Sequence, residues 1–236
     1  MRTLCIDIGN TRTKLGYFEG KDLSEVKELS SDPTDLSSAL NTGDWQLGIL
    51  SNVRADFEFL EEYKSTGRLL EYGEVKLPIE IDYQTPNTLG ADRVCGAIGA
   101  WSHFEGANVL SMDLGTCITF DLIIDGKYLG GKISPGLNMR LKSMHEFTGR
   151  LPLVEWQESA ELGQSTDDSL RSGAFYGIVH ELNGSIESYV RKFGELQVAL
   201  TGGDSFLFAE HLKNHIFADP NLVLRGLQTI LLHNEH

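Results

Sequence analysis

The chain of 236 residues has little that would place it in a membrane or on a nucleic acid. Its apolar residues make up 41% of the total but form no run as long as a membrane span. Its 34 acidic residues outnumber its 20 Lys and Arg residues, giving a formal net charge of −14. General nucleic-acid binding is therefore not expected, because a polyanion needs a basic face. A small anion held in a local pocket remains compatible with this charge.

Cysteine is scarce, and its spacing suggests neither a metal site nor a disulfide framework. Cys5, Cys95 and Cys117 are far apart, with no CxxC pair and no Cys/His metal spacing. We interpret them as small buried apolar residues in a reducing cytoplasm. The N-terminus leads directly into the strand-like TLCIDI without the cleavage site of a secretory signal. We therefore expect a cytoplasmic protein.

Several familiar nucleotide and metal motifs are also missing. The segment GKYLGGK, residues 126–132, has the spacing of a Walker A loop, but Ile133 follows where Ser or Thr is required. The segment also lies between two predicted strands instead of opening a helix. Neither a kinase-type Gly-rich loop with HRD nor an HExxH zinc motif occurs. These absences argue against P-loop nucleotidases, protein kinases and zinc peptidases.

What the sequence does contain is a gap-free internal repeat. LCIDIGNTRTKLGYFEGK, residues 4–21, aligns with LSMDLGTCITFDLIIDGK, residues 110–127. The shared positions include Asp7 with Asp113, Gly9 with Gly115, and Thr13 with Thr119. Each copy predicts a β-hairpin, because a β-rich run ends at Asp-x-Gly and a second one ends at a Glu-Gly or Asp-Gly turn.

The polar turn of each copy is suited to binding a phosphate. Small residues allow several backbone N–H groups to point at one oxyanion. Side-chain donors are added by Asn10, Thr11, Thr13, Thr116 and Thr119.

The charged residues of the two turns have a different role. Asp7 and Asp113 cannot bind phosphate themselves but can hold a cation, directly or through water. Lys14 and Arg12 are available to neutralise charge. Two facing copies would therefore clamp a triphosphate and its cations in a cleft between two halves of the chain. The alternative is that Asp-x-Gly at a strand end is only a turn.

The rest of the chain mixes helices and strands in both halves, which indicates the α/β class. We expect a strand at 45–53, a helix at 55–67, a helix at 90–104, a strand at 127–134, a helix at 135–149, a helix at 167–194, a strand from 196 and a final helix at 220–236. Pro135 is expected as the first residue of its helix. Residues 165–168 have the [ST]xx[DE] pattern of a capping box. Residues 1–105 and 106–236 form the two predicted domains.

TLGADRV, residues 88–94, is a further polar segment. Gly90 begins a predicted helix, which places Asp92 in the first turn, where the helix dipole stabilises a carboxylate. An ionised aspartate can orient a hydroxyl group and accept its proton during phosphoryl transfer. The alternatives are an ordinary first-turn Asp92 and, for Arg93, either a carboxylate-binding role or a surface ion pair.

Six segments, in this order over nearly the whole chain, resemble those of type III pantothenate kinases: DIGNTRTK, GADR, DLGTCITFD, GGKISPG, STDDSLRSG and LTGGD. The first and third resemble the family's phosphate loops, with Cys117 where alanine is usual, and GADR resembles its substrate and catalytic motif. The family belongs to the actin, Hsp70 and sugar-kinase superfamily. The resemblance therefore implies an α/β fold of two ribonuclease-H-like domains with a nucleotide cleft between them.

The resemblance also implies ATP-dependent phosphorylation of pantothenate to 4'-phosphopantothenate, the first step of coenzyme A biosynthesis. Mg²⁺ and a monovalent cation, K⁺ or NH₄⁺, are the implied cofactors. Asp92 is implied as the proton acceptor and Asp113 as the ligand of the monovalent cation. The implied ATP contacts are Asp7, Ile8, Gly9, Asn10, Thr11, Arg12, Thr13, Lys14 and Thr116. The implied pantothenate contacts are Tyr83, Gly90, Ala91, Asp92, Arg93 and Thr166, with Thr166 contributed by a partner subunit of a homodimer.

Two other functions stay open. Some relatives are described as regulatory accessory proteins, so a nucleotide-binding regulator without kinase activity is one alternative. The presence of Asp92 and both loop carboxylates favours the enzyme. A sugar kinase of the same superfamily is the other, although such kinases are usually longer and place the acceptor aspartate elsewhere. Structural roles also stay open for Tyr83, as a half-buried strand aromatic, and for Thr166, as a helix cap.

Overall fold

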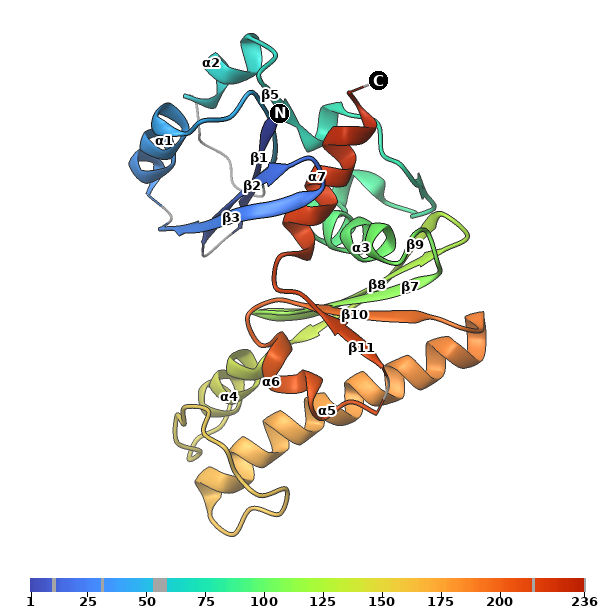
Figure 1. Cartoon of the computed structure of the whole chain (residues 1–236). Coiled ribbons are helices and arrows are strands. Elements are labelled where there is room, and N and C mark those ends of the chain that lie inside the picture. Colours follow the sequence, from blue (N-terminus) through green and yellow to red (C-terminus); the bar gives the residue numbers. More distant parts are fainter. Residues whose placement is uncertain (10–11, 31, 53–58, 214, 236) are drawn as a thin grey trace. The chain divides into compact units, whose positions relative to one another are not determined.

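The computed structural model describes residues 1–9, 12–30, 32–52, 59–213 and 215–235 (Figure 1). It divides into two compact units. Unit 1 contains residues 1–107, 123–129 and 221–236, and unit 2 contains residues 108–122 and 130–220. Unit 1 thus includes two segments from the half of the sequence assigned to the predicted second domain. The domain boundary at residue 105 stays a prediction.

Unit 1 is built on a mixed five-stranded sheet of order β3-β2-β1-β4-β5. The strands are β1 (Arg2–Ile8), β2 (Thr13–Glu19), β3 (Asp22–Leu29), β4 (Leu47–Asn52) and β5 (Leu69–Glu71). β1 pairs antiparallel with β2, and Asp7 lies opposite Lys14 in the register. The predicted first hairpin is therefore confirmed. β4 runs parallel to β1 and places Ser51 beside Asp7.

The α-helices in the described part of unit 1 are α1 (Pro33–Thr42), α2 (Leu60–Ser65), α3 (Ala91–His103) and α7 (Leu222–His233). α3 and α7 lie side by side (Figure 1). A Cβ at Gly99 would overlap the carbonyl oxygen of Leu222, and one at Gly226 would overlap that of Cys95. The helix predicted at 90–104 is confirmed as α3, and Gly99 allows it to approach α7 closely.

The second sheet has six strands in the order β11-β10-β7-β8-β9-β6. Their bounds are β6 (Glu80–Ile81), β7 (Val109–Leu114), β8 (Cys117–Ile124), β9 (Lys127–Pro135), β10 (Gln197–Thr201) and β11 (Ile216–Ala218). β7 and β8 are neighbours, as the predicted second hairpin requires. Asp125 (φ 49°) and Gly126 (φ 73°) both have positive φ between β8 and β9, the conformation of a type I′ turn.

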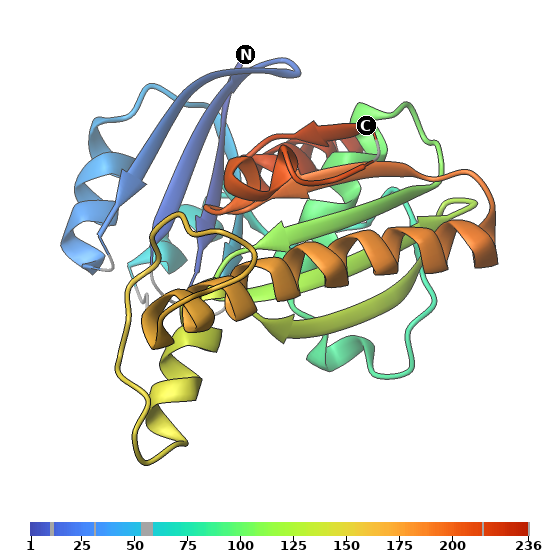
Figure 2. The same cartoon turned by 90° about the horizontal axis from the view of Figure 1, so that it is seen from below.

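The described residues of unit 2 form three helices: α4 (Leu137–Glu146), α5 (Thr166–Phe193) and α6 (Ser205–Ala209). α5 runs along one face of the strands β7 and β10 (Figure 2). Its N-cap is Ser165, whose side chain accepts a hydrogen bond from the Asp168 N–H, and its C-cap is Gly194 at φ 83°. The predicted [ST]xx[DE] start of this helix is therefore confirmed, and Gly194 ends it.

The prediction that Pro135 is the first residue of α4 is wrong. Pro135 is the last residue of β9, and Gly136 is the N-cap of the helix. The Gly136 N–H donates to the carbonyl oxygen of Thr116 at 3.0 Å. A Cβ at position 136 would overlap the backbone of Gly115 and Thr116. This contact with the β7–β8 turn holds residue 136 outside the helix and delays the helix start.

Candidate functional site

The first candidate phosphate loop follows β1 in unit 1. The Gly9 N–H donates to the Arg12 carbonyl at 3.0 Å, which closes the turn across its base. Asn10 and Thr11, two predicted ATP contacts, lie outside the described residues. The side chains of Ile8 and Thr13 are buried in the sheet, with exposed fractions of 0% and 2%. From these two positions only backbone groups could reach a ligand.

Asp7 is the most electrostatically perturbed carboxylate of this loop. Burial raises its pKa from 3.8 to about 6, and the negative charge of Asp92 adds to the rise. The Lys14 ammonium and the Ser51 hydroxyl act in the opposite direction. Its Oδ1 atom is buried and has no hydrogen-bond partner among the described residues. An ionised carboxylate in such a place is expected to need a cation.

The two cationic side chains of this loop already face an acidic residue. Arg12 Nη1 lies 3.0 Å from Glu28 Oε2, and Lys14 Nζ lies 3.8 Å from Glu28 Oε1. Arg12 is largely exposed, whereas the Lys14 side chain is only 23% exposed. Lys14 therefore interacts with both Asp7 and Glu28. The Arg12–Glu28 pair is a surface ion pair and contributes little to the stability of the fold.

Asp92 lies in the first turn of α3, as predicted, with Gly90 as the N-cap. Its carboxylate is exposed, and Oδ1 accepts a hydrogen bond from the Arg93 N–H at 2.9 Å. Ala91 and Arg93 are partly buried beside it. The helix N-terminus thus fixes one carboxylate oxygen and leaves the group accessible to a substrate.

Tyr83, another predicted substrate contact, precedes this helix in unit 1. Its ring is partly buried and packs edge-on against buried Tyr128, with ring centroids 6.1 Å apart. The Asp82 N–H donates to the Tyr128 carbonyl at 3.0 Å, which extends the β6–β9 pairing toward Tyr83. The ring is therefore positioned by the sheet edge, and both the structural and the substrate-binding interpretation remain compatible with it.

The second candidate phosphate loop follows β7 in unit 2. Asp113 is the penultimate residue of this strand and is partly buried, and Thr116 is exposed. The Gly115 N–H donates to the Cys117 carbonyl at 3.1 Å. Gly202, at φ 88°, packs so closely that a Cβ there would overlap Asp113 Oδ1 and the backbone of Leu114. The backbone of Gly202 therefore packs directly against Leu114 and the Asp113 carboxylate.

Gly202 and Gly136 pack against this second loop from other parts of the chain. They were not among the predicted site residues, although their motifs were noted. Gly202 belongs to LTGGD and Gly136 to GGKISPG. Both motifs lie far from Asp113 in the sequence. The signal was a glycine pair after a strand-like run and a glycine after proline, and neither pattern reveals which backbone the glycine approaches.

The two copies of the repeat differ at their turns. In the aligned repeat, Thr13 corresponds to Thr119. β2 begins at Thr13, but β8 begins before Thr119, at Cys117. Thr119 lies inside β8 and its hydroxyl donates to Asp121 Oδ2 at 3.0 Å. Thr119 was expected as a phosphate donor, but this hydroxyl proton is already used within the strand. Thr116 remains the side-chain donor of the second turn.

Thr166 is the first residue of α5 and is exposed. Ser165 supplies the cap of this helix, so the alternative that Thr166 is the cap does not hold. Within unit 1 the structure brings together Asp7, Lys14 and Asp92, whose charges influence one another. Within unit 2 it brings together Asp113, Thr116 and Gly202.

Neither unit carries a preformed multidentate metal centre in its described parts. No group of three or more His, Cys, Asp or Glu side chains in those ranges could hold a metal ion. Cys5 and Cys95 are buried, Cys117 is partly buried, and all three are free thiols. Among the described helices, none combines the length and the apolar content needed to cross a membrane.

Solved structures that resemble this chain have the fold of sugar kinases and their relatives. A conserved Baf family protein from Campylobacter jejuni, described as a putative transcriptional activator, matches with a TM-score of 0.66 at 25% identity, covering 98% of both chains. Lmo2764 from Listeria monocytogenes, a putative N-acetylmannosamine kinase, matches with a TM-score of 0.61 at 15% identity, covering 100% of both chains. The α/β prediction with an actin and sugar-kinase relationship is confirmed at the level of the fold.

Sequence comparisons are more specific. The family model described as "Type III pantothenate kinase" matches residues 3–188. The type III pantothenate kinase of Bacteroides fragilis strain YCH46 is 40% identical over 238 residues, and that of Christiangramia forsetii is 42% identical over 241 residues. Each alignment covers 98% of this chain and 98% of the relative. The chain therefore belongs to the type III pantothenate kinase family.

Proposed function

We propose that this chain uses Asp92 to phosphorylate pantothenate with ATP, the family's reaction in coenzyme A biosynthesis. The observation that carries the assignment of Asp92 is its exposed carboxylate in the first turn of α3, near Asp7 of the first phosphate loop. Arg93 and Tyr83, together with Gly90 and Ala91, are the proposed pantothenate contacts in unit 1.

Asp92 orients the acceptor hydroxyl of pantothenate and takes its proton. The transition state of phosphoryl transfer is loose, so the hydroxyl loses its proton late and a carboxylate is a sufficient base. One oxygen of Asp92 is held by the Arg93 N–H, which leaves the other for the hydroxyl. Positioning and charge neutralisation supply most of the acceleration.

Both loops serve one ATP molecule in this proposal. Asp7 to Lys14 and Thr116 are the proposed nucleotide contacts. The support is the repeat itself, since each copy has a carboxylate at the penultimate position of a strand, and the glycine turn that follows is closed by a backbone hydrogen bond. Backbone N–H groups in such turns suit phosphate oxygens.

The residues of unit 1 fit a role in holding Mg²⁺ with ATP. The unpartnered, buried Oδ1 atom of Asp7 is the observation that supports it, because carboxylate oxygen is the ligand that Mg²⁺ prefers. Asp7 would hold the ion, directly or through water. Mg²⁺ supplies neutralisation of phosphate charge, and Lys14 adds a protein cation on the same side of the loop.

Asp113 is proposed to hold a monovalent cation. We expect activity to rise when K⁺ or NH₄⁺ replaces Na⁺ at constant ionic strength and saturating Mg²⁺, because bulk screening treats these ions nearly alike whereas a fixed site selects by fit. Asp113→Asn should blunt the response, and Asp125→Asn, in the exposed β8–β9 turn, should not. Equal initial rates in the three chloride salts would rule out a specific monovalent site.

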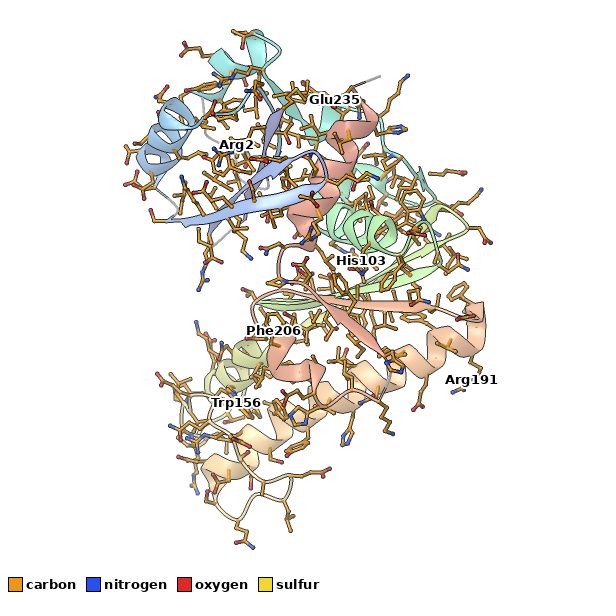
Figure 3. All side chains as sticks on the ribbon, viewed as in Figure 1. Arg2, His103, Trp156, Arg191, Phe206 and Glu235 are labelled. Atoms are coloured by element: carbon orange, nitrogen blue, oxygen red, sulfur yellow. The ribbon has the colours of Figure 1, made fainter. Side chains whose placement is uncertain are left out.

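A homodimer is proposed, with Thr166 of one copy reaching pantothenate in the other. Large apolar side chains are exposed in and around the segment before α5: Phe147 (84%), Leu162 (79%) and Leu153 (60%). Phe206 on α6, labelled in Figure 3, is 62% exposed. We infer that a partner subunit covers these side chains, because large exposed apolar areas mark sites of association. Sedimentation equilibrium should give twice the 26.1 kDa chain mass, and a monomer at assay concentration would contradict the proposal.

The test of the proposed function is a coupled assay of ADP release with pantothenate as acceptor. Hexoses in place of pantothenate test the sugar-kinase alternative, and nucleotide binding without turnover on any acceptor would indicate the regulatory alternative.

A further inference from the structure

Unit 1 has a cavity of about 430 Å³ that the proposed reaction does not use. Its lining comes from α3, α7, β2 and the segments beside them, all within unit 1. His103, labelled in Figure 3, is the last residue of α3 and lines the cavity. Asp92 starts the same helix, and the two positions are separated by about 16 Å of helix axis. The cavity is thus at the opposite end of α3 from the proposed base.

The charge of the lining differs from that of the chain. Four lining residues are basic, namely Lys21, His103, Arg225 and His233, and none of the described lining residues is acidic. In the whole chain, acidic residues outnumber Lys, Arg and His together, 34 against 27 (20 + 7). The charged residues of this lining are all basic, although the protein has a net charge of −14. Such a pocket favours an anionic ligand.

The remaining lining combines apolar surface with fixed polar groups. Pro78 and Leu232, both partly buried, supply apolar surface, and the fully buried Phe18 lies behind it. Gln228 is only 2% exposed and is held rigidly, since its Oε1 accepts from Thr3 Oγ1 at 2.8 Å and its Nε2 donates to the Gly20 carbonyl at 2.6 Å. The walls are therefore anchored to the sheet, as in a preformed ligand site, and the volume lies in the usual range for small ligands.

We propose that this cavity is a second ligand site, separate from the ATP and pantothenate contacts, for a small organic anion. The ligand class is a compact apolar body, aromatic or short-chain, that carries one carboxylate or phosphate group. The apolar part lies against Pro78 and Leu232, and the anionic group meets Lys21 and Arg225, with the two histidines as further donors. We choose this ligand class because the lining contains both basic and apolar side chains, and the ligand must match both.

Isothermal titration calorimetry on the full chain tests the site with three probes: phenyl phosphate, its neutral analogue benzyl alcohol, and inorganic phosphate. We expect phenyl phosphate to bind with a Kd of about 0.1–1 mM, the range for a ligand of its size. Benzyl alcohol lacks the anionic group and inorganic phosphate lacks the apolar ring. Each should therefore bind at least about tenfold more weakly than phenyl phosphate. Saturating Mg²⁺-ATP alone, and saturating pantothenate alone, should each leave the Kd of phenyl phosphate unchanged.

Substitutions locate the binding. Lys21→Gln and Arg225→Gln should each weaken phenyl phosphate by about tenfold, the usual effect of losing a charge-assisted contact. Lys76→Gln is the matched control, because Lys76 is an exposed lysine of unit 1 outside the lining. Lys21 lies in the exposed turn after β2, so its substitution does not endanger folding even if that of Arg225 does.

Displacement of phenyl phosphate by ATP or pantothenate would overturn the proposal, as would equal binding of benzyl alcohol or an unchanged Kd in Lys21→Gln. The proposal would also be overturned if none of the three probes bound measurably. The test needs no turnover, and Asp92→Asn should bind phenyl phosphate like the parent. Failure of the kinase mechanism and failure of the second site are therefore distinguishable.

Discussion

Asp92→Asn should lower turnover with pantothenate by about two to four powers of ten, the range for loss of a general base. Asparagine has nearly the same shape and keeps the hydrogen bond from the Arg93 N–H, but its amide cannot accept the hydroxyl proton at neutral pH. The carboxylate is exposed in the first turn of α3, so the substitution leaves the packing of the helix unchanged. The measurement is the initial rate of pantothenate-dependent ADP release at saturating substrates.

The matched control is Asp44→Asn, which makes the same change at an exposed position in unit 1. It should keep the parent rate. ATP binding to Asp92→Asn, measured by calorimetry, should stay within a few-fold of the parent, because Asp92 acts on the acceptor. Turnover near the parent value in Asp92→Asn would remove this residue from the mechanism.

Asp7→Asn should make the ligand-free protein more stable and less active. Burial raises the Asp7 pKa from 3.8 to about 6, so the ionised carboxylate lowers the stability of the folded state at neutral pH. An asparagine cannot ionise and avoids this cost. We expect the free energy of unfolding at pH 8 to rise by about 1–3 kcal/mol, the amount that a shift of this size represents. Activity with Mg²⁺-ATP should fall by about two powers of ten or more.

The pH dependence follows from the direction of the shift. Between pH 3.8 and about 6 the folded chain keeps a proton on Asp7 that the unfolded chain has lost. The stability contributed by Asp7 therefore falls as pH rises through this window and stays low above it. The stability difference between Asp7→Asn and the parent should be small near pH 4 and complete at pH 8. Urea unfolding at both values measures it, and a difference that shrinks with rising pH would contradict the assigned shift.

A double substitution connects the two loops. If Asp7 and Asp113 serve one nucleotide and its cations, adding Asp113→Asn to Asp7→Asn should cost less activity than Asp113→Asn costs alone. Fully additive losses would indicate two independent sites.

The hairpins, the helix caps and the place of Asp92 could be predicted from the sequence, because each depends on residues close together in the chain. Asp7 and Gly9 lie where the strand β1 passes into a turn, which is a local feature of the sequence. Ser165 caps α5 through the Asp168 N–H, only three residues away. Gly90 and Asp92 likewise share one helix start.

What the sequence did not reveal depends on distant backbone. Gly202 and Gly136 have their roles because Asp113 and Thr116 lie against them, and no local pattern records such an approach. The wrong start of α4 has the same origin, since proline is a good first helical residue and only the contact of Gly136 with the β7–β8 turn prevents it. The raised Asp7 pKa depends on burial between strands and on Asp92, far away in the sequence.

The central claim is that this member of the family is an active pantothenate kinase, and the most direct measurement is ADP release from Mg²⁺-ATP with and without pantothenate. The account predicts release that depends on pantothenate, saturates with it, is absent with hexoses, and is lost in Asp92→Asn. ADP release that is independent of pantothenate, or no release despite measurable ATP binding, would contradict it.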